Sequence, residues 1–187
     1  MDENHLNTYQ EKYTNVFIER EIMTKEICDW IIDESNRKVM ELYGGWKNER
    51  KIKYPTHDIR ITNLPESVLN LIKKIFEKKI VNLLYKNYSI PYNYKCHLTE
   101  GFIIKYELDT QTKLDPHMDD TDMTISILLS DEKSFEGGGM RFKNGLTVLP
   151  NQGDAIFHSS KHEHEGLEIT SGVRMILVFF IDIVLKM

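Results

Sequence analysis

Cysteine is scarce in this chain of 187 residues, which contains only Cys28 and Cys96. Two cysteines cannot supply a disulfide framework or a thiolate zinc cluster, and such scarcity is typical of proteins from reducing compartments. Any metal site in this chain must therefore be built from histidine and carboxylate side chains.

Positive charge is also in short supply, because 24 Lys and Arg residues against 29 Asp and Glu residues leave a net charge of −5. Such a chain has no general attraction for nucleic acid or anionic membranes, so we expect neither as a partner. The most apolar stretch, Met175 to Ile181, is far shorter than the roughly 20 residues that span a bilayer. The polar N-terminal sequence MDENHLNTYQEKY shows no export signal. We therefore expect a soluble, cytoplasmic protein.

The first half of the chain predicts two helices. Thr24 is a suitable N-cap for a helix with apolar residues at three-to-four spacing, and Gly44-Gly45 would end it. A second helix is predicted from about Asn63 and Pro65 to Asn87. One face of this helix carries four lysines, which we interpret as a solvated surface: Lys73, Lys74, Lys78 and Lys79.

The second half of the chain is rich in predicted strands. From Tyr92 onward, short β-branched and aromatic runs alternate with turn clusters, and the runs are 101–108, 117–130, 140–149, 155–158 and 173–184. Gly137-Gly138-Gly139 and Pro150–Gly153 would connect antiparallel strands, because no helical pattern separates the runs. The pattern predicts an α+β fold in one domain, 1–187, with helical support over about 16–90 and a β-sandwich or barrel over about 92–184.

A candidate metal site combines His117 and Asp119 with a remote histidine. In a strand, residues i and i+2 point to the same face, so this imidazole and carboxylate would aim at one point. His164 lies 47 residues downstream, near the end of another predicted strand. Two imidazoles and one carboxylate form the facial triad that suits Fe(II) and oxygen chemistry. Zinc would instead favour a closed tetrahedral set or a water in the fourth position.

Arg174 is a candidate anion-binding residue, ten residues after His164 in an apolar strand. A core-facing arginine is costly unless an anion neutralises it, and its planar guanidinium can hold a carboxylate through two hydrogen bonds. Lys105 and Arg141 are the next candidates for the same role. His162 is a rival to His164 as the distal ligand.

His158 follows Phe157 on a predicted inner strand. We interpret it as a structural histidine with satisfied hydrogen bonds, or as one that supports a metal ligand.

Several short motifs together carry a family resemblance, and each is weak alone. They are Phe102–Tyr106, Pro116–Asp119, Thr124–Ser126, Glu136–Phe142, Gly153–Ala155, and His164–Leu167 followed by Gly172–Arg174. In this order and spacing they strongly resemble the 2-oxoglutarate- and Fe(II)-dependent dioxygenases, and most of all the catalytic domain of the procollagen lysyl hydroxylases. With Tyr54–Ile59 as an entry strand, the resemblance covers roughly residues 16–184.

The resemblance implies a double-stranded β-helix, a jelly-roll or cupin-like fold, with the N-terminal helices packed on one sheet. It implies that His117, Asp119 and His164 bind Fe(II) and that Arg174 pairs with the distal carboxylate of 2-oxoglutarate. It also implies that Tyr106 bonds this cosubstrate. Ser126 stands where the family pattern has an Asn, so it would be a shorter donor and acceptor there. Ascorbate dependence is implied by the family alone.

The implied reaction is hydroxylation of a C–H bond, of a lysyl side chain in a protein or peptide, with decarboxylation of 2-oxoglutarate to succinate. A prolyl or small-molecule hydroxylase on the same fold is one alternative. A non-catalytic jelly-roll binding module is another. The irregular loops at 44–53, 87–93 and 108–116 would determine which substrate binds. Their sequences do not predict that substrate.

Overall fold

The computed structural model of the chain describes residues 15–47 and 56–186. Three sequence features used above lie outside these ranges: the N-terminal segment, positions 54–55 of the predicted entry strand, and positions 48–53 of the first irregular loop.

Helix α2, Lys25–Tyr43, begins and ends where the sequence predicts. Thr24 Oγ1 accepts a hydrogen bond from the Ile27 backbone N–H at 3.4 Å. Gly44 ends the helix with φ of 72°, a left-handed conformation that glycine adopts without a steric penalty, and its N–H bonds the Met40 carbonyl. The N-cap and C-cap rules therefore hold at both ends of this helix.

The second predicted helix is a composite of four segments. A 3₁₀ turn, η1 (Ile61–Asn63), precedes α3 (Glu66–Ile75), and a π-helical segment, η2 (Phe76–Ile80), joins α3 to α4 (Val81–Tyr88). Its extent confirms the sequence prediction, but the extra residue of a π turn leaves no signature in a pattern of apolar spacing. The four lysines are exposed, as predicted.

Two antiparallel sheets form the rest of the fold. The larger has the strand order β1-β9-β5-β11-β3-β2, with β6 paired to the start of β11. Its bounds are β1 Phe17–Glu19, β9 Ala155–Ser159, β5 Met123–Leu128, β11 Ile169–Leu185, β3 Tyr94–Glu107, β2 His57–Arg60 and β6 Phe135–Gly137. The smaller sheet has the order β4-β10-β7-β8, with β4 Leu114–His117, β10 His164–Gly166, β7 Met140–Phe142 and β8 Thr147–Val148.

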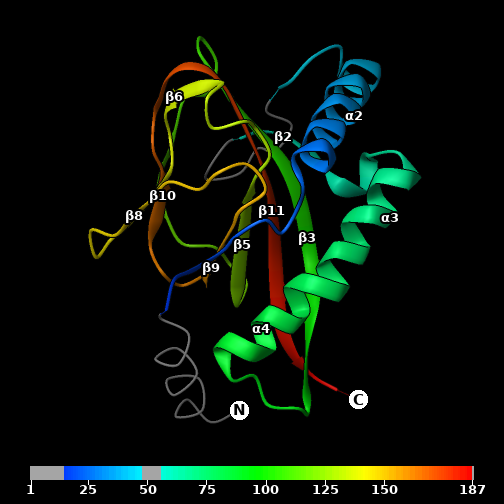
Figure 1. The fold of residues 1–187 in the computed structure, drawn as a ribbon, viewed down its shortest axis with the longest axis vertical. Coiled ribbons are helices and arrows are strands. Elements are labelled where there is room, and N and C mark those ends of the chain that lie inside the picture. The colour runs from blue at the N-terminus through cyan, green and yellow to red at the C-terminus, as the bar shows by residue number, and fades with distance from the viewer. Residues whose placement is uncertain (1–14, 48–55, 187) are drawn as a thin grey trace.

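The helices lie along one side of the large sheet, and the small sheet lies on the other side (Figure 1). On β11, Met175 and Leu177 belong to the core under the helices, whereas Ile176 and Val178 belong to a separate cluster on the other face. Because strand side chains alternate between faces, Arg174 also points away from the helices. The space between the sheets therefore receives the side chains of Arg174, Tyr106, Thr124 and Ser126.

The predicted strand 117–130 is two strands, β4 and β5, separated by a loop at 118–122. The sequence predicts His117 at the entry of a strand and His164 near the end of one; both predictions are wrong, because His117 ends β4 and His164 begins β10. The two glycine-containing connections join strands of different sheets: 138–139 link β6 to β7, and 149–154 link β8 to β9. Apolar runs show that strands exist, but they do not show which sheet each strand joins.

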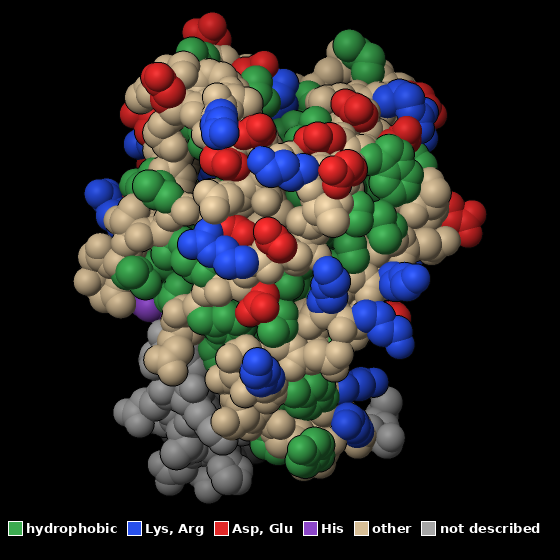
Figure 2. All heavy atoms as spheres, viewed as in Figure 1, with side chains coloured by type: hydrophobic (Ala, Val, Ile, Leu, Met, Phe, Trp, Pro, Cys, Tyr) green, Lys and Arg blue, Asp and Glu red, His purple; other side chains and the backbone are tan. Residues whose placement is uncertain are grey.

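The described part of the chain contains no helix that is long and apolar enough to cross a bilayer. On the face shown in Figure 2, acidic and basic side chains are mixed in the upper half, and basic side chains gather at the lower right, where α3 and α4 lie in Figure 1.

Candidate metal centre and anion pocket

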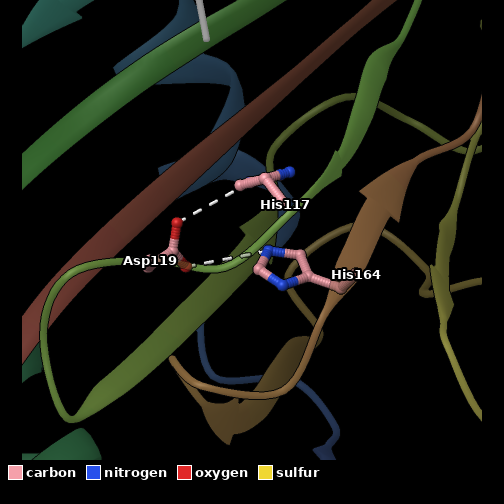
Figure 3. A group of neighbouring side chains, drawn as sticks. All are labelled: His117, Asp119 and His164. Carbon is pink, nitrogen blue, oxygen red and sulfur yellow. Dashed lines mark ion pairs between the residues drawn. The ribbon is translucent and has the colours of Figure 1, made fainter. Parts of the chain in front are cut away.

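His117, Asp119 and His164 converge between the sheets (Figure 3). The two histidines are directly opposite partners on β4 and β10, with ring centroids 4.4 Å apart. Asp119 lies between them: its Oδ1 is 3.6 Å from His117 Nε2, and its Oδ2 is 3.7 Å from His164 Nε2. One potential ligand atom from each residue falls within 4.8 Å of the others. This separation suits atoms that share one metal ion.

Hydrogen bonds to backbone carbonyls set the tautomer of both histidines. His117 Nδ1 lies 2.8 Å from the Asp115 carbonyl oxygen, and His164 Nδ1 lies 2.9 Å from that of His162. A carbonyl oxygen can only accept, so each Nδ1 carries a hydrogen, and in the neutral ring the lone pair then lies on Nε2, on the side of the Asp119 carboxylate. Burial lowers the pKa of His164, against the attraction of the Asp119 charge. Neutral imidazole is the form that binds metal.

Asp119 reaches the cluster from a loop, not from the strand face that the sequence analysis assumed. It lies two residues beyond the end of β4, and its backbone N–H donates to the Ser160 carbonyl at 2.9 Å. The loop and its hydrogen bond to Ser160, and not the alternation of side chains along a strand, therefore direct the carboxylate towards the histidines.

Arg174 and Tyr106 are directly opposite partners on β11 and β3. The guanidinium carbon lies 5.1 Å from the centre of the Tyr106 ring. Arg174 is only 2% exposed, and burial lowers its pKa. Its Nη1 has no hydrogen-bond partner among the residues that the structure describes, and no carboxylate there forms an ion pair with it. A buried cation without an anion is the feature expected of an anion-binding site.

One cavity extends from the His117, Asp119 and His164 side chains to Arg174. Its lining includes every site residue that the sequence predicts. Its lining includes the polar residues Tyr106, His117, Asp119, Thr124, Ser126, His164 and Arg174. Ser126 is 3% exposed and faces this cavity from β5. Apolar side chains such as Ile104, Ile176 and Val178 form much of the remaining wall.

Known proteins resemble this chain in sequence and in fold. No protein-family model matches the chain. The chain is 30% identical over 178 residues to the rat multifunctional procollagen lysine hydroxylase and glycosyltransferase LH3, covering 86% of this chain and 22% of that protein. It is 33% identical over 175 residues to rat procollagen-lysine,2-oxoglutarate 5-dioxygenase 1, covering 86% and 23%. The chain is a homologue of part of the procollagen lysine hydroxylases. It spans less than a quarter of the length of these curated relatives.

Solved structures share the fold of this chain at low sequence identity. The viral collagen prolyl hydroxylase of Paramecium bursaria Chlorella virus-1, solved with 2-oxoglutarate, has a TM-score of 0.66 at 16% identity and covers 91% of this chain and 96% of its own. A 2OG-Fe(II) oxygenase-family protein of Burkholderia pseudomallei has a TM-score of 0.68 at 17% identity, covering 89% and 85%. The two sheets of this chain are thus a jelly-roll double-stranded β-helix with helices packed on one sheet, as predicted.

The side chains that line this cavity fit the two groups that the sequence resemblance implies, Fe(II) and 2-oxoglutarate. Two Nε2 lone pairs and one carboxylate make the donor set of a facial Fe(II) site. The partnerless Nη1 of Arg174 fits the distal carboxylate of 2-oxoglutarate.

The rival residues lie elsewhere. Arg141 is exposed and pairs with Glu165, and Lys105 pairs with Glu107. Neither lines the cavity. His162 lies in the turn before β10, outside the triad, so His164 is the histidine that meets His117 and Asp119.

His158 is fully buried on β9, with its ring centroid 4.4 Å from that of His164. Its Nδ1 lies 2.9 Å from the Ser159 carbonyl oxygen, but its Nε2 has no partner among the described residues. The expectation of a fully satisfied histidine is therefore wrong for one nitrogen. Burial holds the pKa of His158 well below its usual value, so it is neutral in the fold.

Sequence reasoning gave no role to Thr124, although it lies inside one of the quoted motifs. Its Oγ1 donates to Asp119 Oδ2 at 2.5 Å. Strand alternation was the available signal, because Thr124 and Ser126 share a face of β5.

Proposed function

We propose that this chain is an Fe(II)- and 2-oxoglutarate-dependent dioxygenase that hydroxylates a lysyl side chain in a protein or peptide. The observation that carries the proposal is the single cavity that holds both a His-Asp-His cluster and a buried arginine without an anion. We further propose that the chain works as one domain, with the helices at about 16–90 supporting a catalytic barrel at about 92–184.

His117, Asp119 and His164 would hold Fe(II), and Arg174 with Tyr106 would hold the distal carboxylate of 2-oxoglutarate. When bound, the iron and cosubstrate supply oxidation by O₂, in which 2-oxoglutarate is decarboxylated to succinate and a substrate C–H bond becomes C–OH. Ser126 would offer a short hydroxyl to the bound cosubstrate from β5. Ascorbate is proposed as an accessory reductant on the family relationship alone.

The protein's own residues bind, orient and exclude water. Arg174 is planar and buried, so a carboxylate paired with it takes a fixed orientation in the cavity. The apolar wall, which includes Ile104, Ile176 and Val178, strengthens this ion pair because it keeps the local dielectric constant low. The backbone carbonyls bonded to the two Nδ1 atoms keep both imidazole rings in the orientation that ligation requires.

The lysyl substrate is proposed from the sequence relatives, which are named procollagen lysine hydroxylases and are 30–33% identical to this chain. The viral collagen prolyl hydroxylase shares the fold at only 16% identity, so it favours proline less strongly. Both names describe enzymes that act on protein chains.

The metal and cosubstrate assignment can be tested by adding Fe(II) and 2-oxoglutarate without oxygen. We expect a visible charge-transfer absorption band in the native protein and none in His117→Ala. His97→Ala is the matched control, because His97 is exposed on β3. Identical spectra for the native protein and His117→Ala would show that the iron site is wrong.

The substrate assignment needs lysine-bearing and proline-bearing peptides of otherwise equal sequence. We expect a mass gain of one oxygen on lysine with stoichiometric succinate. Hydroxylation of proline alone would reject the lysyl assignment but keep the dioxygenase. A native charge-transfer band without any oxygen-dependent loss of 2-oxoglutarate would instead favour the non-catalytic binding module.

A further inference from the structure

We propose that Thr121, Ser160 and Thr124 form a directed chain of hydroxyl groups that positions Asp119 for metal binding. Thr124 Oγ1 lies 2.5 Å from Asp119 Oδ2, Ser160 Oγ lies 2.8 Å from Thr124 Oγ1, and Thr121 Oγ1 lies 3.0 Å from Ser160 Oγ. This inference rests on the proposed Fe(II) site. The three hydroxyl residues are positioning residues that act through Asp119.

The Asp119 carboxylate sets the donor direction of the hydrogen bonds between these hydroxyl groups. An ionised carboxylate can only accept, so Thr124 must donate its single hydroxyl hydrogen to Asp119. Thr124 Oγ1 then accepts from Ser160, and Ser160 Oγ in turn accepts from Thr121. The O–H bonds of Thr124 and Ser160 point towards Asp119, and the Thr121 hydroxyl lies closer to Ser160 Oγ, at 3.0 Å, than to its other acceptor, the Met123 carbonyl, at 3.5 Å. Hydrogen bonds aligned in this way polarise and strengthen one another in a buried site.

The residues that carry these hydroxyl groups are buried and held by backbone hydrogen bonds. Thr124 is 2% exposed and Ser160 is fully buried, so water does not compete freely for their hydroxyls. Backbone bonds hold the same two segments together: Asp119 N–H donates to the Ser160 carbonyl at 2.9 Å, and Ser160 N–H donates to the Asp122 carbonyl at 3.0 Å. Ser160 therefore ties the loop that carries Asp119 to the turn that leads to His164.

Neutral hydroxyls suit this task better than a cation would. An arginine or lysine on the carboxylate would fix its orientation but would offset the negative charge that attracts a divalent ion. The nearby ammonium, Lys161 Nζ, bonds the backbone carbonyl of Asp119 at 3.0 Å and not the carboxylate. The hydrogen bond from Thr124 thus orients the carboxylate, which keeps its negative charge for the metal.

The test measures metal affinity in the full chain without turnover, using Co(II) and its visible absorption spectrum. Thr124→Val removes the hydroxyl and keeps the shape, and we expect Co(II) affinity to fall by about 10- to 100-fold, as is typical when a partner of a metal ligand is lost. Thr124→Ser keeps the hydroxyl, and it should restore most of the affinity and the native spectrum. Thermal unfolding checks that each variant is folded.

Ser160→Ala and Ser35→Ala form a matched pair, because each removes one fully buried hydroxyl and only Ser160 contacts Thr124. We expect weaker Co(II) binding in Ser160→Ala and native binding in Ser35→Ala. If Thr124→Val does not fold, this pair decides the question.

Two failures are distinguishable. Native protein that binds no Co(II) would reject the proposed metal site itself. Equal Co(II) affinity in the native protein, Thr124→Val and Ser160→Ala would keep that site and overturn the positioning role.

Discussion

His117 and His164 face each other across neighbouring antiparallel strands, β4 and β10, and are direct register partners although 47 residues separate them in the chain. The sheet hydrogen bonds hold two imidazole rings side by side, so only Asp119 must be aimed from a loop. A metal site on strands is held more rigidly than one built wholly on loops.

Asp119→Asn should weaken metal binding strongly. The change preserves shape but removes the only carboxylate of the triad, and a divalent ion loses several kcal/mol of attraction when a unit charge at contact distance is neutralised, even in water. We expect a loss of Fe(II) or Co(II) affinity on the order of 100-fold or more, measured by anaerobic titration. Asp120→Asn is the control, because it makes the same change at an exposed neighbour. Equal losses in both variants would contradict the role of Asp119.

Arg174→Lys should weaken 2-oxoglutarate binding while retaining a positive charge. Lysine cannot offer the two parallel N–H donors of a guanidinium, and the buried ion pair would lose about 2 to 5 kcal/mol if it were broken completely. Calorimetric titration with 2-oxoglutarate in the presence of Mn(II) measures the change. Arg141→Lys makes the same substitution at an exposed residue paired with Glu165 and should leave the affinity unchanged. An unchanged affinity in Arg174→Lys would move the anion site elsewhere.

Gly138→Ala should displace the Arg174 side chain by direct steric contact. Gly138 has φ of 70°, and a Cβ there would lie 2.9 Å from Arg174 Cδ and 3.2 Å from Phe135 Cε2. Backbone strain should cost about 1 to 2 kcal/mol of folding free energy. The displaced arginine should also weaken 2-oxoglutarate binding roughly tenfold, equivalent to about 1.4 kcal/mol.

Gly145→Ala separates these two effects. Gly145 has φ of 89°, and nothing lies within 4 Å of its added Cβ. Urea unfolding should show a similar loss of stability in both variants, whereas 2-oxoglutarate titration should show a loss only in Gly138→Ala. Equal affinities would mean that Gly138 does not position Arg174.

Cys28 should make stability fall at alkaline pH. Burial raises the pKa of this thiol from 9.0 to about 12 in the fold. Between these values the unfolded chain releases the proton while the folded chain keeps it, so the unfolding free energy should decrease by about 1.4 kcal/mol per pH unit. Chemical denaturation of the native protein and Cys28→Ala from pH 8 to 11 measures the difference in slope. Parallel curves would show that the thiol titrates normally.

Local sequence signals predicted much of what depends on neighbours along the chain. Thr24 and Gly44 marked both ends of α2, because capping is decided within one turn. The π-helical segment at Phe76–Ile80 and the break between β4 and β5 escaped prediction, since both depend on how the segment packs against the rest of the fold.

The sequence by itself determined the chemistry available to this protein. With two cysteines and an acidic balance, the site had to use histidine and carboxylate, and motif order selected His117, Asp119, His164 and Arg174. Only the tertiary structure decided that these groups share one cavity, that Thr124 holds the Asp119 carboxylate, and that Arg174 is buried without a counter-ion among the described residues. The reason is physical: residue types set donor atoms and charges, whereas strand register and burial set distances and the cost of an unpaired charge.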